Sequence, residues 1–412
     1  MWCACSIAST MRWHADQCTT GSWIVSRIAK AKLTIRRRLR SLLLSVQGVA
    51  MNRRTLLKSG AWAIAGVALP GHARRAGRSA APVIDGNLVA PLDPDTPLDA
   101  ATVAQVRASG LTAFKMTLGG SGNQSKVETQ AEIADLGKGI ARNPDLFRQV
   151  LTAKDLAPVP SGAIGIIYSF EAAAMLEGQI ANIDHFRAAG VLVMGLSYNT
   201  LSPFASGVLA PQATGLTPLG REAIDRMNRL GVTIDLSHSD ELSSIAAIAA
   251  SRQSTLVTHA GCSAIHPHPR NKSDTLMRAL ADTGGVIGIY ELAFLVPAPA
   301  QPVLDDYVAH LIHALDVCGE DHVGIGTDGL LTPFDTSPES MKAWDADIAR
   351  RKASGVGAPG EGPPPFVIGL NRPDRYAVIA DALRRKGYSA RIIDKILGEN
   401  FRRVFRQTWT RS

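Results

Sequence analysis

The chain has 412 residues, with 44 Lys and Arg against 36 Asp and Glu, and its formal net charge is +8. The positive excess is confined to residues 1–78, which hold 14 basic residues and one acidic residue and leave 30 basic and 35 acidic residues for 79–412. Because the body of the chain is mildly acidic, we expect no nucleic-acid partner. A composition of 46% apolar and 19% charged residues also excludes a disordered or fibrous protein.

Residues 51–78 have the order of an export signal. The paired arginines Arg53 and Arg54 precede an apolar run over 60–70, and small residues around Ala73 follow it. This order resembles a twin-arginine signal peptide, and it predicts a periplasmic or exported protein. The apolar run is too short to cross a bilayer core of ~30 Å, so we expect no stable membrane anchor. The alternative is an amphipathic helix of the mature fold.

Residues 1–50 form a basic extension. We expect it to lie outside the mature protein, with Met51 as the true start; a functional basic arm is the alternative. Two cysteines, Cys262 and Cys318, fall in the body of the chain, and their spacing is typical of neither a zinc site nor a disulfide framework. Whether these two thiols pair stays open.

The body of the chain repeats one theme, in which a short apolar, β-rich run is followed by a loop and an amphipathic stretch. Eight such runs occur, at 83–89, 111–118, 163–171, 191–199, 232–238, 255–259, 285–290 and 322–328. Nearly continuous apolar strands separated by helical segments are typical of a parallel sheet buried on both faces. We therefore predict an α/β fold of the (β/α)8 TIM-barrel type, as a single domain over 79–412. A dinucleotide-binding sheet has no support, since no Gly-x-Gly-x-x-Gly follows the first run.

Polar residues close most of the predicted strands. The third, fifth, sixth and eighth runs end in Glu171, His238, His259 and Asp328. In a parallel barrel these ends meet on one face, and two imidazoles with carboxylates form a ligand set that suits zinc. Taken singly, each residue has a structural alternative: a histidine can be a hydrogen-bonded rim residue, Glu171 an ion-pair partner and Asp328 a helix cap.

Four segments resemble the membrane (renal) dipeptidase family of zinc-dependent dipeptidases. They are Val-Thr-Ile-Asp-Leu-Ser-His238, the stretch from Thr258-His259 through Arg270-Asn-Lys-Ser-Asp, His-Val-Gly-Ile-Gly-Thr-Asp328-Gly, and the C-terminal Leu-Gly-Glu-Asn400-Phe. The resemblance extends over about residues 83–408. The His…His…Arg-Asn-x-x-Asp series is its most specific part.

The resemblance implies a (β/α)8 barrel with two zinc ions bridged by a glutamate, which is Glu171 in this sequence. It implies that His238 and His259 bind the second zinc ion, and that Arg270 holds the free carboxylate of a dipeptide, which suits a guanidinium. The resemblance also makes Asp328 the acid that passes a proton to the leaving amine. Tyr198, within Leu-Ser-Tyr-Asn, is expected to line the substrate pocket.

The first strand departs from the family. Its usual Asp-Gly-His-x-Asp supplies the His and the second Asp that bind the first zinc ion, but this chain has Asp85-Gly-Asn87-Leu-Val89. Asn87 and Val89 thus replace the two expected ligands, and valine has no ligand atom. We expect the first site to be absent or weakened, so that one zinc ion binds; two remain possible if Asp85 is recruited.

These observations favour a metal-dependent dipeptidase that hydrolyses dipeptides or related N-acyl amino acids through a zinc-activated water. One alternative is a catalytically impaired member that binds small carboxylates. Another is a mononuclear-zinc amidohydrolase of different specificity, such as a deaminase or lactonase. Members of the family often form homodimers, and the resemblance makes a homodimer one possibility for this chain.

Two segments after the eighth run carry further expectations. The charges of 341–352 are typical of a solvated helix face. The Gly- and Pro-rich stretch 353–365 is typical of a flexible loop over the active face, either a lid or a passive insertion.

Overall fold

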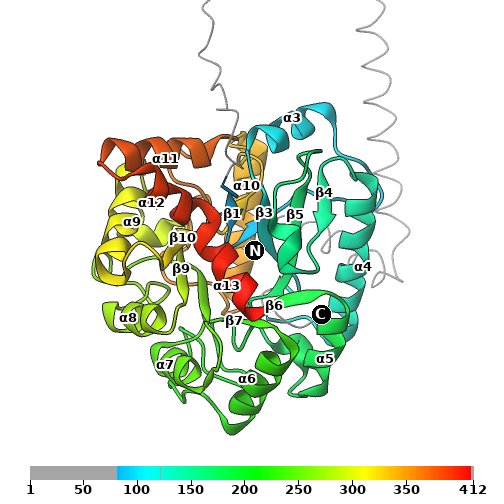
Figure 1. Ribbon diagram of the computed structural model, residues 1–412, viewed down its shortest axis with the longest axis vertical. Coiled ribbons are helices and arrows are strands. Elements are labelled where there is room, and N and C mark those ends of the chain that lie inside the picture. The colour runs from blue at the N-terminus through cyan, green and yellow to red at the C-terminus, as the bar shows by residue number, and fades with distance from the viewer. Residues whose placement is uncertain (1–80, 121, 410–412) are drawn as a thin grey trace, which may run out of the picture. The chain divides into compact units, whose positions relative to one another are not determined.

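The computed structural model describes residues 81–120 and 122–409, in which eight parallel strands close into a ring (Figure 1). The ring strands are β1 (Ile84–Asp85), β3 (Ala113–Thr117), β5 (Ile164–Phe170), β6 (Val191–Gly195), β7 (Thr233–Asp235), β8 (Leu256–Ala260), β9 (Val286–Ile289) and β10 (Val323–Ile325). Pairing of β1 with β10 and of β3 with β5 closes the ring. The predicted (β/α)8 barrel is therefore confirmed, and each ring strand falls inside one predicted run except β8, which ends one residue beyond its run. The predicted extension and signal peptide lie outside the described residues.

Three short strands were not predicted. β4 (Phe147–Gln149) pairs with β5 outside the ring, and β2 (Leu88–Val89) forms a separate parallel pair with β11 (Gly329–Leu330). The apolar run 83–89 thus divides at Gly86 into two strands of different sheets. The sequence did not reveal them as separate strands, because β4 stands in no apolar run and because β2 and β11 adjoin the runs of the ring strands β1 and β10.

Helices follow most ring strands and surround the barrel (Figure 1). They are α3 (Ala100–Ala108), α4 (Lys126–Arg142), α5 (Ala181–Ala188), α6 (Pro218–Leu230), α7 (Glu241–Ala250), α8 (Asp274–Asp282), α9 (Leu304–Cys318), α10 (Pro338–Ala353), α11 (Arg375–Arg385), α12 (Ala390–Asp394) and α13 (Asn400–Thr408). Single 3-10 turns lie at Ala153–Leu156, Ala174–Leu176 and Ala293–Leu295, and a π-helical turn, Lys395–Glu399, joins α12 to α13. Local signals set several helix ends: Ser125 and Glu128 form a capping box for α4, and Gly231 ends α6 in the left-handed conformation.

The C-terminal helix α13 crosses the end of the barrel that faces the viewer in Figure 1. The Phe401 ring is fully buried and would lie 2.8 Å from a Cβ at Gly86 and 2.5 Å from one at Gly324. Trp409 Nε1 donates to Thr233 Oγ1 at 3.0 Å. The amino-terminal end of the barrel is therefore filled, which leaves the carboxyl ends of the strands as the open side for a site.

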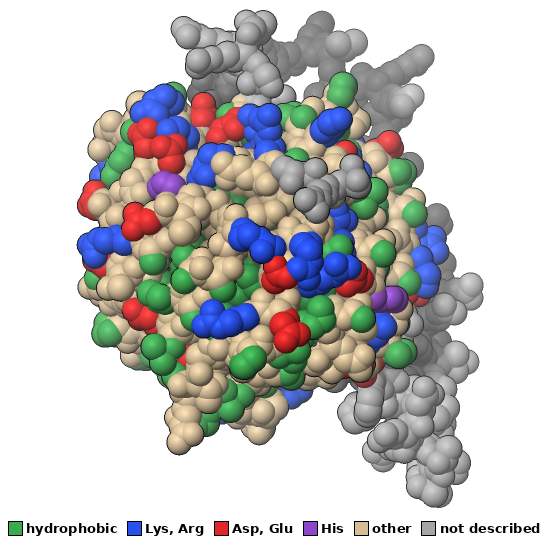
Figure 2. Space-filling model, turned by 60° about the horizontal axis from the view of Figure 1, so that its bottom comes forward, with side chains coloured by type: hydrophobic (Ala, Val, Ile, Leu, Met, Phe, Trp, Pro, Cys, Tyr) green, Lys and Arg blue, Asp and Glu red, His purple; other side chains and the backbone are tan. Residues whose placement is uncertain are grey.

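On the face shown in Figure 2, basic and acidic side chains are interspersed. Such a mixture gives no strong field of one sign over that face. Among the residues that the structure describes, no helix is both long enough and apolar enough to cross a membrane. Cys262 and Cys318 are free, buried thiols, so the structure does not pair them.

Candidate metal centre

Three side chains that could hold a metal ion meet at the carboxyl ends of β5, β7 and β8. Glu171 follows β5 directly, His238 lies three residues beyond β7, and His259 is the fourth residue of β8. One possible ligand atom from each lies within 4.8 Å of the others. All three are buried, with exposed fractions of 2%, 4% and 0%. The sequence therefore placed these residues at strand ends that the fold brings together.

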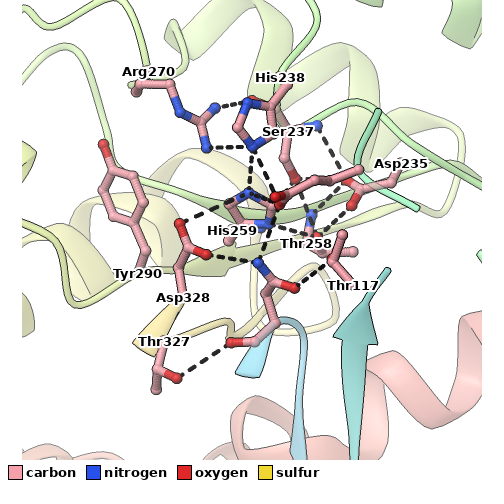
Figure 3. A network of polar contacts seen from close by, with 12 residues as sticks. Thr117, Asp235, Ser237, His238, Thr258, His259, Arg270, Tyr290, Thr327 and Asp328 are labelled. Carbon is pink, nitrogen blue, oxygen red and sulfur yellow. Dashed lines mark hydrogen bonds and ion pairs between the residues drawn. The ribbon is translucent and has the colours of Figure 1, made fainter. Parts of the chain in front are cut away.

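The two imidazoles turn the same ring atom toward the carboxylate. The Nε2 atoms of His238 and His259 are 3.0 Å apart, and Glu171 Oε2 lies 3.3 Å from the first and 3.4 Å from the second. Figure 3 shows both rings pointing toward a common centre, with Arg270 and Asp328 on either side. The hydrogen-bond partner of each Nδ1 atom therefore decides whether the facing Nε2 atom carries a hydrogen.

Asn199 fixes the proton position on His238. The Asn199 side-chain NH2 donates to the Val356 carbonyl at 2.9 Å, which leaves its amide oxygen 2.9 Å from His238 Nδ1. An amide oxygen only accepts, so Nδ1 carries the ring hydrogen. His238 Nε2 is then an acceptor, which is the form that binds metal ions.

Thr258 fixes the proton position on His259. The Thr258 hydroxyl donates to Asp235 Oδ2 at 2.6 Å, so its oxygen accepts from His259 Nδ1 at 2.9 Å. Burial opposes ionisation of Asp235, but its ion pair with Lys115 and its bonds from Ser237 and Thr258 lower its pKa and keep it a carboxylate. His259 Nε2 is therefore also an acceptor.

The local backbone makes this arrangement possible. The pairing of β8 with β9 shifts register between Val257 and Ala260, so the strand bulges where Thr258 and His259 lie. A Cβ at Gly326, which follows β10, would lie only 1.8 Å from the Thr258 carbonyl oxygen. Bulges of this kind redirect side chains next to active sites. Gly326 leaves room for the bulge in β8, because it has no side chain to meet the Thr258 carbonyl.

Electrostatics keep both histidines neutral. Burial, followed by the positive charge of Arg270, lowers the pKa of His238 to about 3 and lowers the pKa of His259 well below its usual value. At neutral pH, two ring nitrogens with lone pairs therefore face a carboxylate oxygen. Arg270 Nη2 reaches His238 Nε2 at 3.3 Å and Asn87 Nδ2 reaches Glu171 Oε2 at 3.4 Å, at the long end of hydrogen-bond distances. Two imidazoles and a carboxylate fit a zinc ion, because they form one of its recurrent three-ligand sets.

Arg270 and Tyr198 lie against His238. The Arg270 guanidinium is 2% exposed and also donates to the Ser237 carbonyl. The Tyr198 ring stacks on the His238 ring with centroids 4.2 Å apart and an interplanar angle of 21°. Both predicted substrate-binding side chains are thus placed beside the ligand set, and neither is a surface residue.

Asp328 lies beside His259 and below Arg270 in the view of Figure 3. Its Oδ2 is 4.0 Å from His259 Nε2, and burial together with the Glu171 carboxylate raises its pKa. The backbone of Asp328 has φ = 55°, a left-handed conformation that few residues other than glycine adopt. Its N–H donates to the Asn87 carbonyl at 2.8 Å, which holds the carboxylate at the site.

The first strand supplies an amide in place of a ligand pair. Asn87 Nδ2 donates to Asp328 Oδ1 at 2.7 Å, while Val89 pairs in β2 with Leu330 and is buried in the core. Asp85 does not join the ligand set, because its oxygens accept from the Thr327 N–H and the Tyr376 hydroxyl.

The expectation of a solvated face on α10 was wrong for Asp347 and Arg351, which are 7% and 3% exposed. Arg351 is ion-paired with Glu361 in the following loop, with both side chains 4% exposed, and it hydrogen-bonds to the Tyr198 hydroxyl. The charge of Arg351 looks exposed in the sequence because its partners lie in that loop and after β6.

Hydrogen bonds also connect the loop 353–365 to the residues around it. Ala358 N donates to Glu361 Oε2 at 2.8 Å, the Trp344 indole donates to the Gly362 carbonyl at 2.7 Å, and Val356 bonds to Asn199 as described above. These bonds join the loop to α10 and to Asn199, so it lies against the residues of the site, and its role as a lid or a passive insertion stays a prediction.

Lys115 and Thr258 of the surrounding network were missed in the sequence. Lys115 is a charged residue inside a buried apolar strand, and that exception to the strand pattern was a usable signal. Thr258, by contrast, is an ordinary strand residue, and its role depends on the bulge in β8.

A known family and two known proteins are similar to this chain in sequence. The sequence profile of the family "Membrane dipeptidase (Peptidase family M19)" matches residues 93–350. An uncharacterized protein in the pqqA 5' region of Klebsiella pneumoniae is 28% identical over 291 residues, which cover 68% of this chain and 95% of that protein. The dipeptidase tcpJ of Claviceps purpurea is 28% identical over 222 residues, which cover 52% of this chain and 45% of that protein.

Solved structures share the fold. An amidohydrolase from Pseudomonas aeruginosa superposes with a TM-score of 0.67 at 28% identity, over 80% of this chain and 97% of that one. A metallopeptidase from Rhodobacter sphaeroides, solved with a phosphinate mimic of the dipeptide L-Ala-D-Ala, gives a TM-score of 0.59 at 18% identity, over 80% of this chain and 99% of that one. The second likeness supports the barrel alone.

Proposed function

Because the chain belongs to the membrane dipeptidase family, peptidase family M19, and is a metallodipeptidase, we propose that it hydrolyses dipeptides or related N-acyl amino acids with the help of zinc bound by Glu171, His238 and His259. The observation that carries the proposal is the position of the two Nε2 atoms, which lie 3.0 Å apart and face the Glu171 carboxylate. Zinc bound there would lower the pKa of a water molecule and polarise the scissile carbonyl.

Arg270 is the candidate for substrate recognition. A guanidinium binds a carboxylate through two parallel N–H groups, and burial strengthens such a pair. Its present contacts with the Ser237 carbonyl and His238 Nε2 keep it at the ligand set. A substrate carboxylate held by Arg270 would therefore direct the adjacent amide bond toward Glu171 and the histidines, with Tyr198 forming one side of the pocket.

Asp328 is the candidate for proton transfer. Its raised pKa brings the carboxyl closer to the pH at which it can both hold and release a proton. Asn87 fixes one oxygen at 2.7 Å, which leaves the other oxygen, 4.0 Å from His259 Nε2, on the side of the ligand set. We assign Asp328 the transfer of a proton to the leaving amine.

The substrate class can be tested with an Arg270→Ala variant of the full-length protein. We expect KM for dipeptides to rise at least tenfold, while cleavage of matched amides without a free carboxylate changes little. Arg278→Ala, on the exposed side of α8, is the control and should leave both unchanged. Equal effects of Arg270→Ala on both substrate types would contradict carboxylate recognition.

We further propose that residues 51–78 direct export to the periplasm through the twin-arginine route, and that the basic extension 1–50 is absent from the mature protein. The order of paired arginines, apolar run and small residues supports the proposal. Replacement of Arg53 and Arg54 by lysine should retain the enzyme in the cytoplasm. Unchanged export of that variant would contradict the route.

A further inference from the structure

A lysine ammonium is buried in the barrel wall near the candidate metal centre. Lys115 is the middle residue of β3 and has no exposed surface. Its Nζ lies 3.3 Å from Asp235 Oδ2 and donates to Thr117 Oγ1 at 3.1 Å. A buried ammonium requires such partners, because it loses its hydration. It also only donates, which sets the direction of the hydrogen bonds beyond it.

The same order of donor and acceptor continues from Lys115 through Thr117 to Asn87. Because Thr117 Oγ1 accepts from Lys115, its own hydrogen is available to Asn87 Oδ1 at 3.0 Å. The Ser169 hydroxyl lies farther from Thr117, at 3.4 Å, and donates its own hydrogen to the Met116 carbonyl. The amide oxygen of Asn87 therefore faces Thr117, and its NH2 group faces the carboxylates.

The Asn87 NH2 group links the two carboxylates of the site. It donates to Asp328 Oδ1 at 2.7 Å and points to Glu171 Oε2 at 3.4 Å. Because the two hydrogens of an amide can serve two acceptors, one neutral group approaches both carboxylates. Figure 3 shows Thr117, His259 and Asp328 around this point.

We propose that the row Lys115–Thr117–Asn87 replaces the first metal ion of two-zinc dipeptidases, so that this centre holds one metal ion. This inference rests on the proposed function. The two expected ligand positions do not fit a metal ion: Asn87 directs hydrogens at the carboxylates, and Val89 has no ligand atom and pairs in β2. The row therefore directs the N–H groups of Asn87 at the two carboxylates, where a cation would otherwise lie.

A structural role confined to the Lys115–Asp235 ion pair makes a different prediction. In that case Asn87 has no part in excluding a second cation, and the number of bound metal ions would not depend on residue 87. Metal stoichiometry therefore separates the two explanations without relying on activity.

The test is a titration of metal-free, full-length protein with Co²⁺, followed by visible absorption and by elemental analysis after gel filtration. We expect saturation at one equivalent per chain. Two equivalents would overturn the inference and leave the proposed function intact. No binding would overturn both, so the two failures are distinguishable.

Asn87→Asp exchanges the NH2 group for an oxygen at constant size and should raise the stoichiometry to two. Asn123→Asp adds the same charge at an exposed position and should leave it at one. If Asn87→Asp does not fold, Asn87→His combined with Val89→Asp is the second variant, with two equivalents again expected. A folded variant that still binds one equivalent would overturn the role of Asn87.

Discussion

At the scale of single residues, the candidate centre depends on hydrogen bonds that decide which ring nitrogen carries a proton. Asn199 is fixed by the Val356 carbonyl and in turn fixes His238, while Thr258 is fixed by Asp235 and in turn fixes His259. Asn199 and Thr258 contact the histidines but are not themselves candidate metal ligands. They matter because a histidine with hydrogen on Nε2 cannot bind a metal ion through that atom.

Replacement of Asn199 tests this dependence. Asn199→Ala removes the acceptor for His238 Nδ1, and we expect zinc affinity to fall by about 10- to 100-fold. Asn199→Asp keeps an acceptor at the same place and should retain most of the affinity. Competition with a chromophoric chelator measures both. Equal affinities in the alanine variant and the native protein would show that Asn199 does not set the state of His238.

Replacement of Asp328 tests the proton-transfer role. Asp328→Asn keeps the size and the contact with Asn87 but cannot carry the proton, so kcat for a dipeptide should fall by about 10²- to 10⁴-fold. Zinc affinity should stay near that of the native protein, since Asp328 is outside the ligand set. Steady-state kinetics and chelator competition on the same preparation provide both values. A loss of zinc equal to the loss of rate would instead assign Asp328 to metal binding.

At the scale of elements, α10 and the loop after it act as a wall that fixes the site. The buried Arg351–Glu361 pair holds the loop on the helix, and Arg351 and Val356 reach Tyr198 and Asn199 after β6. Disturbance of this wall should therefore affect both stability and metal binding.

Arg351→Met tests the wall. The change leaves the buried Glu361 carboxylate unpaired, so we expect the free energy of unfolding to fall by about 3–5 kcal/mol. Lys352→Met, at the neighbouring exposed position, should change it by less than about 0.5 kcal/mol. Urea denaturation followed by circular dichroism gives the difference. A similar small change in both variants would mean that the loop is held by other contacts.

The sequence predicted the ring strands well, because each is an apolar run long enough to stand out and because Glu171, His238, His259 and Asp328 end four of those runs. It did not predict the partners of these residues. Asn199 and Val356 are 157 residues apart, and Lys115 and Asp235 are joined only by the closure of the barrel. Charges on α10 looked solvated for the same reason, because residue identity alone does not distinguish a buried ion pair from an exposed charge.

At the scale of the whole molecule, the barrel is closed at its amino-terminal end by α13 and holds a buried polar network at the other. Part of that network is structural. Asp85 accepts hydrogen bonds from two backbone N–H groups and Tyr376, yet burial outweighs them and raises its pKa to about 6. Since its usual value is 3.8, the folded protein binds this proton more tightly than the unfolded chain does.

Stability should therefore depend on pH through Asp85. The contribution is fully present below pH 3.8 and is lost as the pH rises through about 6, and a shift of this size corresponds to about 3 kcal/mol. Asp85→Asn cannot titrate. We expect the stability of the native protein relative to this variant to increase as the pH falls from 7 toward 4, in denaturation experiments on metal-free protein. A constant or opposite difference would contradict the assignment.

We propose above that a metal ion held by Glu171, His238 and His259 drives dipeptide hydrolysis. The most direct test is the rate of dipeptide hydrolysis by metal-free, full-length protein as zinc is added, alongside a Glu171→Gln variant whose fold is checked by circular dichroism. We predict no hydrolysis without metal, recovery that saturates with bound zinc, and no recovery in Glu171→Gln. Hydrolysis by the metal-free protein, or full recovery in the variant, would contradict the claim.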